Sequence, residues 1–158
     1  MITLRTTPEI LGHQELKSMP LYRAAAAEFL GTLMLVMAAC ASAMSSGLTL
    51  SAALAPGLMQ AAIIQAIGHI SGGHVNPAVT LSFCLCRNVS VVRGLFFLVV
   101  QVAGAITASG ILYSVVPNIY HNNLGIATKN DDISNAQAFG VEVLVTFIFV
   151  LTIQGSFG

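Results

Sequence analysis

Four long runs of apolar residues dominate the chain, and short polar segments separate them. A helix needs about 20 mostly apolar residues to cross the ~30 Å hydrocarbon core of a bilayer, and each run is that long. We therefore predict four membrane-spanning helices, over residues 21–44, 49–70, 91–116 and 138–157. Residues 1–20 are polar and contain no apolar core typical of a cleaved signal peptide, so we expect a cytoplasmic N-terminal tail there.

A glycine-rich polar turn interrupts the apolar pattern between the second and third runs. Asn is a preferred N-cap and Pro fits the first helical position, so Asn76 and Pro77 predict a helix that begins here and extends over residues 77–86. Its length, roughly 15 Å, is about half of the hydrocarbon core. Irregular backbone at membrane depth is tolerated only where protein buries it or where it lines a water-filled cavity. The pattern therefore predicts an all-α membrane protein with one re-entrant half-helix at a pore.

The distribution of charge sets the orientation and excludes some classes of protein. Charged residues make up 8% of the chain, against about 25% in soluble domains. The net charge is zero, which argues against a nucleic-acid partner. The positive-inside rule then predicts a cytoplasmic N-terminus and an extracellular segment 117–137. This prediction rests on the basic residues Arg5, Lys17, Arg23, Arg87 and Arg93.

Two motifs carry a resemblance to a known family. The segment 71–80, Ser-Gly-Gly-His-Val-Asn-Pro-Ala-Val-Thr, resembles the first Asn-Pro-Ala box of the aquaporin (major intrinsic protein) family, and residues 27–32 resemble the first-helix motif of that family. Gln65, Gln101 and the segment 140–142 also occur in family order. The resemblance implies an aquaporin-like right-handed helical bundle over residues 21–158 and a passive water channel. It further implies a multi-pass protein of the plasma membrane, without enzymatic activity or cofactor, that forms a homotetramer in its full-length form.

The box contains the residues that we expect to line the pore. Asn76 caps the half-helix, and its amide N–H can donate a hydrogen bond to the oxygen of a passing water. The helix N-terminus adds about half a positive charge, which repels cations. The glycines allow unusual backbone dihedrals, so the segment can offer carbonyl groups to the water file. The predicted pore-lining residues in this box are Gly72, Gly73, His74, Asn76, Pro77 and Ala78.

Pro56 is a departure from the family pattern. The resemblance places it where an aromatic residue usually narrows the filter. A proline there could widen the pore toward glycerol, urea or other small neutral solutes, or it could be a simple helix irregularity near the outer end of the second span. Both interpretations stay open, and Pro56 belongs to the expected pore lining.

Four polar residues inside or beside the spans are expected to brace the pore loop. A carboxylate at mid-membrane costs about 2.5–3.5 kcal/mol and needs partners. The resemblance implies that Glu28 holds the loop around His74 and that Glu142 holds a second loop, with Gln65 and Gln101 as further braces. His74 is expected to brace the loop and not to bind a metal; the cysteines Cys40, Cys84 and Cys86 predict no zinc site either.

The resemblance also implies a second Asn-Pro-Ala box after the fourth span, as in an inverted repeat. Residues 28–33 and 142–147 are similar, and the two segments run in opposite directions across the membrane. We therefore expect the sequence to be C-terminally incomplete. Two other functions stay open: a non-conducting subunit that associates with full-length channels, and a proton-coupled carrier.

Overall fold

The computed structural model describes residues 10–44, 49–125 and 127–156, and this part of the chain is helical with connecting loops. Four of its helices are long and apolar enough to cross a membrane. The predicted all-α membrane fold is therefore confirmed. The helices are α2 (Met19–Met44), α3 (Thr49–Ser71), the short α4 (Pro77–Leu85), α5 (Val91–Val115) and α6 (Asn135–Ser156), with 3-10 turns η1 (His13–Lys17) and η2 (Asn118–Tyr120).

The fourth span begins three residues earlier than the apolar pattern predicts, at Asn135 and not at residue 138. Ser134 and Gln137 form a reciprocal cap just there. The Ser134 N–H donates to Gln137 Oε1 at 2.8 Å, and the Gln137 N–H donates to Ser134 Oγ at 3.2 Å. A capping box of this kind satisfies two backbone donors that the first turn leaves unpaired. The polar first turn of α6 is therefore helical although it is not part of the apolar run.

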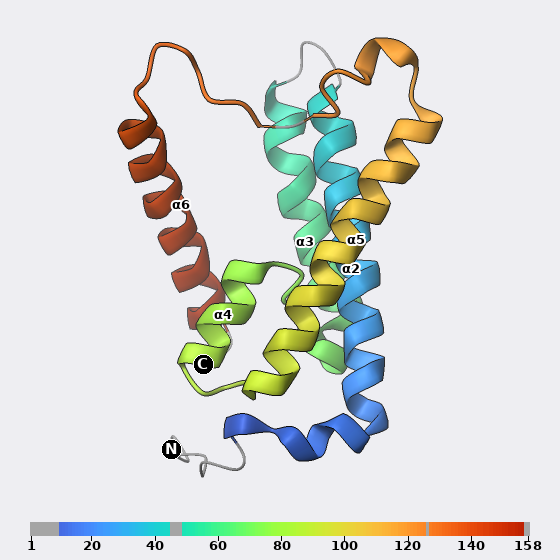
Figure 1. Cartoon of the computed structure of the whole chain (residues 1–158). Coiled ribbons are helices and arrows are strands. Elements are labelled where there is room, and N and C mark those ends of the chain that lie inside the picture. Colours follow the sequence, from blue (N-terminus) through green and yellow to red (C-terminus); the bar gives the residue numbers. More distant parts are fainter. Residues whose placement is uncertain (1–9, 45–48, 126, 157–158) are drawn as a thin grey trace.

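Helices α2, α3 and α5 lie side by side and form the main bundle (Figure 1). Small residues allow the close approach of α2 and α5: a Cβ at Gly104 would lie only 2.6 Å from the Phe29 carbonyl oxygen. Side chains that are at most 2% exposed fill the centre of this bundle, among them Leu21, Ile63 and Phe97. The closely packed bundle therefore provides a surface against which the polar loop after α3 can pack.

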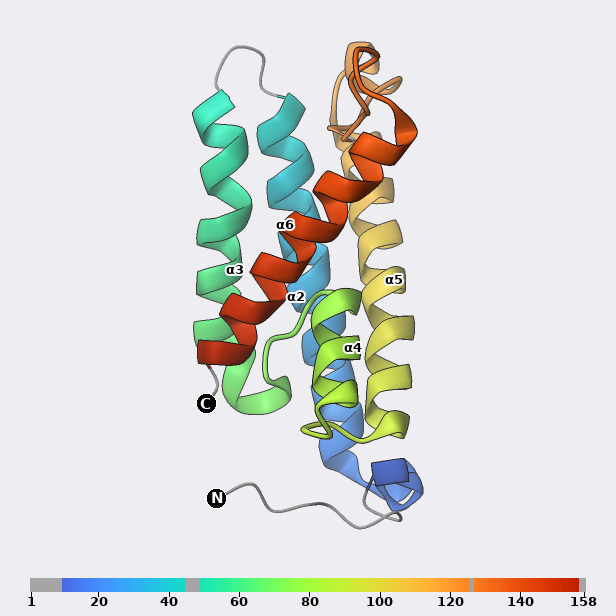
Figure 2. The same cartoon turned by 90° about the vertical axis from the view of Figure 1, so that its left-hand side faces the viewer.

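The chain re-enters the bundle after α3. Residues 72–76 return from the end of α3 toward the middle of the bundle (Figure 1). Helix α4 then runs alongside α5 to the end of the molecule at which α3 ended (Figures 1 and 2). Helix α4 has nine residues, so it is about half as long as a helix that crosses the hydrocarbon core. Its N-terminus therefore lies at the middle of the bundle, as the Asn-Pro start predicts.

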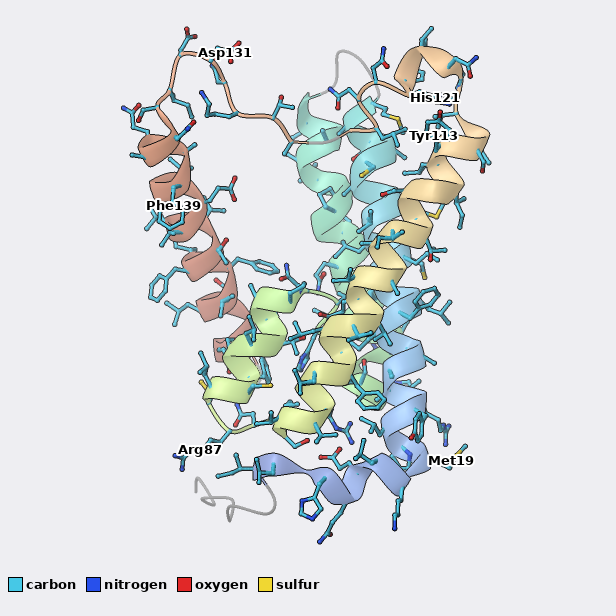
Figure 3. All side chains as sticks on the ribbon, in the orientation of Figure 1. Met19, Arg87, Tyr113, His121, Asp131 and Phe139 are labelled. Atoms are coloured by element: carbon cyan, nitrogen blue, oxygen red, sulfur yellow. The ribbon has the colours of Figure 1, made fainter. Side chains whose placement is uncertain are left out.

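Helix α6 stands apart from the main bundle, and the C-terminal end of α6 contacts α4 (Figure 1). Gln154 Nε2 donates a hydrogen bond to Ser82 Oγ at 3.0 Å across this contact. None of the residues 135–156 is buried, and Phe139, near the start of the helix, is 72% exposed (Figure 3). At the same end as this contact, η1 lies across the bundle, and Glu15 pairs with Arg93 of α5 at 2.7 Å.

Candidate pore and its bracing network

The loop between α3 and α4 has an unusual backbone. Gly72 and Gly73 have φ values of 95° and 64°, and Val75 has a φ of 40°. Glycine enters this left-handed region at no steric cost, but a β-branched residue there is an outlier. Such a conformation persists only where the surroundings over-determine it. The contacts of this loop therefore have to hold Val75 in place.

Glu28 supplies these contacts from α2. Its carboxylate is fully buried and accepts four hydrogen bonds. Oε1 accepts from Ser71 Oγ at 2.7 Å and from the His74 N–H at 2.9 Å. Oε2 accepts from the Val75 N–H at 2.6 Å and from Gln101 Nε2 at 2.8 Å. Hydrogen bonds to a charged group contribute about 1.5–3 kcal/mol each. The four bonds therefore supply the partners that a carboxyl group at membrane depth needs.

A second layer of contacts connects the loop to α4 and α5. Gln101 Nε2 also donates to Thr80 Oγ1 at 2.9 Å, and His74 Nδ1 lies 3.2 Å from the same hydroxyl oxygen. The His74 ring packs against Phe83 and Phe97, with centroid distances of 4.6 Å and 5.4 Å. His74 is thus enclosed by loop-bracing partners, and the described residues contain no group of three His, Cys, Asp or Glu side chains that could hold a metal ion.

Asn76 stands at the point where the loop becomes α4. Its Oδ1 accepts a hydrogen bond from the Ala78 N–H at 2.8 Å and so caps the helix. Within the described residues its amide group has no acceptor, so the NH₂ remains available as a donor. The positive end of the α4 dipole lies at the same place. Asn76 therefore presents a donor and a positive potential together.

A cavity of about 470 Å³ opens beside Asn76, between α2, α3 and α6. The described residues that line it are apolar except for two, Asn76 and Gln60. The lining consists of Leu35, Val36, Ala39, Pro56, Gly57, Gln60, Asn76 and Phe149. The cavity therefore has apolar walls with hydrogen-bonding groups at a few points, which is the usual composition of a site for a small molecule.

Two of the predicted pore residues, Pro56 and Asn76, line this cavity. The other predicted pore residues do not line it: Gly73 and His74 are buried, Gly72 and Ala78 are half-buried, and Pro77 is exposed. Their contribution of carbonyl groups to a water file stays a prediction.

The predicted bracing residues divide into two groups. Glu28 and Gln101 contact the loop or its helix directly. Gln65 and Glu142 are exposed, and neither makes a side-chain hydrogen bond to the part of the chain that the structure describes.

Gln60 is the glutamine of α3 that reaches the loop, and the sequence analysis did not identify it. Its Nε2 lies 3.4 Å from the Gly73 carbonyl oxygen, to which it donates. The available signal was its position four residues after Pro56, because residues i and i+4 share one face of a helix.

Comparisons with known proteins agree with this arrangement. The model of the major intrinsic protein family matches residues 15–157. The lens fiber major intrinsic protein of Gallus gallus is 38% identical over 148 residues, which are 91% of this chain and 56% of that protein. Aquaporin-5 of Sus scrofa is 40% identical over 147 residues, 90% of this chain and 56% of that protein. The chain thus spans about half the length of the curated relatives that it matches.

Proposed function

We propose that this chain, which belongs to the major intrinsic protein family, forms part of the wall of a passive water channel. It is an integral membrane protein with four apolar helices long enough to span the bilayer. The observation that carries the proposal is Asn76, which caps a half-length helix at mid-depth and lines a cavity. A relative that matches most of the chain is named an aquaporin, which supports water as the solute.

The electrostatics of this site favour water over cations. The donor on Asn76 and the positive end of α4 both attract the oxygen atom of water, and the same field opposes the entry of a cation. Carbonyl groups of Gly72, Gly73 and His74 would replace hydrogen bonds that water loses on entering the pore. No chemical step and no cofactor is needed, since solute moves down its own gradient.

The proposed setting follows from the charge pattern. We place the N-terminus and the Arg87 end of α4 in the cytoplasm and segment 117–137 outside the cell, in the plasma membrane. We further propose a homotetramer in which each protomer contains its own pore. A proton-coupled carrier fits less well, because four donors occupy the Glu28 carboxylate and it does not line the cavity.

Osmotic swelling tests the proposal on membrane vesicles that contain the protein in its natural assembly. We expect a higher water permeability than in protein-free vesicles. The Asn76→Asp variant keeps an N-cap on α4, since Asp and Asn cap equally well. It replaces the NH₂ donor with a negative charge, so water permeability should fall while the amount of folded protein is unchanged.

Wild-type vesicles that are no more permeable than protein-free ones would overturn the channel proposal. That outcome would favour the second candidate, a non-conducting subunit that associates with full-length channels. The exposed surface of α6 suits such an association. Co-purification with a full-length channel of the same family would then identify the subunit.

A further inference from the structure

Gln60 is a polar side chain in the apolar interior of α3. Its side chain is 8% exposed, and it lies in a helix whose composition suits the hydrocarbon core. A buried amide that lacks hydrogen-bond partners costs free energy, so such a group is expected to be fully paired. Gln60 is therefore expected to have a partner for its amide oxygen and for its NH₂ group.

The described residues satisfy only one end of this amide. Nε2 donates to the Gly73 carbonyl oxygen over a long distance, 3.4 Å. Oε1 accepts no hydrogen bond from any residue that the structure describes. Because Gln60 also lines the 470 Å³ cavity, the missing donor can come from a molecule inside it. The terminal torsion of a glutamine is soft, so a small rotation can turn Oε1 toward that molecule.

The residues near Gln60 combine hydrogen-bonding groups with an apolar surface. Pro56 lies one turn earlier on the same face of α3 and lines the same cavity. Proline has no N–H, so the Ala52 carbonyl group, four residues earlier, receives no helical hydrogen bond from it. The Asn76 amide supplies a donor to the same cavity. Leu35, Val36 and Phe149 make the remaining surface apolar.

We propose that Gln60 is a specificity-determining residue that, together with Asn76, selects a small uncharged polyol. The hydroxyl groups of a polyol donate to Gln60 Oε1 and accept from the Asn76 NH₂, while its C–H groups face Leu35, Val36 and Phe149. This inference rests on the proposed channel function. It adds a second hydrogen-bonding point to the pore and places it on α3, away from the Asn-Pro-Ala segment.

The test compares glycerol uptake with water permeability in vesicles that contain the naturally assembled protein. Gln60→Leu removes the amide. Gln60→Met does so at nearly the same side-chain length, which guards against a packing effect of leucine. We expect both variants to lower the ratio of glycerol to water permeability by about two- to tenfold, the effect of one lost hydrogen bond. Gln14→Leu changes an exposed glutamine of η1, remote from the cavity, and should leave the ratio unchanged.

The possible outcomes distinguish a failure of the Gln60 inference from a failure of the proposed channel function. Water conduction with an unchanged glycerol-to-water ratio in both Gln60 variants overturns the inference and leaves the channel intact. Wild-type vesicles that conduct water but take up no glycerol overturn the inference as well. Wild-type vesicles that conduct neither solute overturn the inference together with the proposed function.

Discussion

At the scale of single residues, Glu28 is the group on which most of the site depends. Its two oxygens accept from the loop backbone, from Ser71 and from Gln101, so one carboxylate connects α2, the re-entrant loop and α5. The strained φ of Val75 is held by the shortest of these bonds, at 2.6 Å. The geometry of the re-entrant loop is therefore set from a neighbouring helix and not by the loop itself.

Glu28→Gln tests this dependence. An amide keeps the shape of the side chain but turns an NH₂ donor toward groups that also donate, and buried donors are left unpaired. We expect a loss of about 3 kcal/mol in the free energy of unfolding, since each unpaired buried donor costs about 1–3 kcal/mol. The measurement is chemical denaturation in detergent, followed by circular dichroism.

Asp131→Asn is the matched control, because Asp131 is exposed in the loop before α6, outside the membrane-spanning helices. An exposed substitution of this kind is expected to change stability by no more than about 0.5 kcal/mol. Equal effects of the two substitutions would contradict the bracing role of Glu28.

The polar contacts of the site could be predicted only in part. Glu28 and Gln101 follow from the motifs around them, and Asn76 follows from the Asn-Pro helix start. The different burial of the two glutamines of α3 could not be predicted from the sequence in this way. Gln65 is exposed and Gln60 is buried, yet both stand among apolar residues. In a helix that is apolar on all sides, the sequence pattern does not show which face packs inward.

At the scale of helices, the bundle depends on the contact between α2 and α5. Gly104 brings α5 against the backbone of α2, where a Cβ would lie 2.6 Å from the Phe29 carbonyl oxygen and 3.3 Å from the Leu33 nitrogen. Backbone atoms inside a helix cannot yield as a flexible side chain can. The contact therefore fixes how closely Gln101 on α5 approaches Glu28 on α2.

Gly104→Ala should separate these helices. We expect it to destabilise the protein by about 1–3 kcal/mol, the usual cost of overpacking. Gly110→Ala is the control on the same helix, since a Cβ there meets nothing within 4 Å. It should be neutral, or stabilising by up to about 1 kcal/mol through higher helix propensity. Thermal unfolding of both variants in detergent measures the difference, and identical melting temperatures would refute the close-packing argument.

The lengths of the helices were more predictable than their arrangement. Long apolar runs locate the long helices to within three residues at each end, because membrane thickness sets the number of residues that a helix needs. The start of α6 differs because Ser134 and Gln137 extend the helix beyond the apolar run. The separation of α6 from the main bundle depends on tertiary contacts, which apolar composition does not encode.

At the scale of the whole molecule, the two ends of the bundle differ in charge. Arg87 lies at one end, whereas Asp131 lies at the other (Figure 3). Arg93 and Glu15 form their ion pair at the Arg87 end, where η1 crosses the bundle. On the positive-inside rule we propose that this end faces the cytoplasm.

The exposed thiol of Cys86 can report this orientation directly. In a Cys40→Ser, Cys84→Ser background, we expect a membrane-impermeant maleimide to label Cys86 only after the cells are permeabilised. The matched control also changes Cys86 to Ser and adds Asp131→Cys at the opposite end, and it should label in intact cells. Labelling of Cys86 in intact cells would reverse the proposed orientation.

The four-donor carboxylate also has a consequence for the order in which the protein is made. Glu28 and its last partner, Gln101, are 73 residues apart. At 5–20 residues per second the ribosome needs about 4 to 15 s to make this stretch. During that interval Glu28 lacks the donor that α5 supplies, although it lies in a helix long and apolar enough to span the membrane. We therefore expect α2 to leave the insertion machinery only after α5 has been made, so that the two helices enter the lipid as partners.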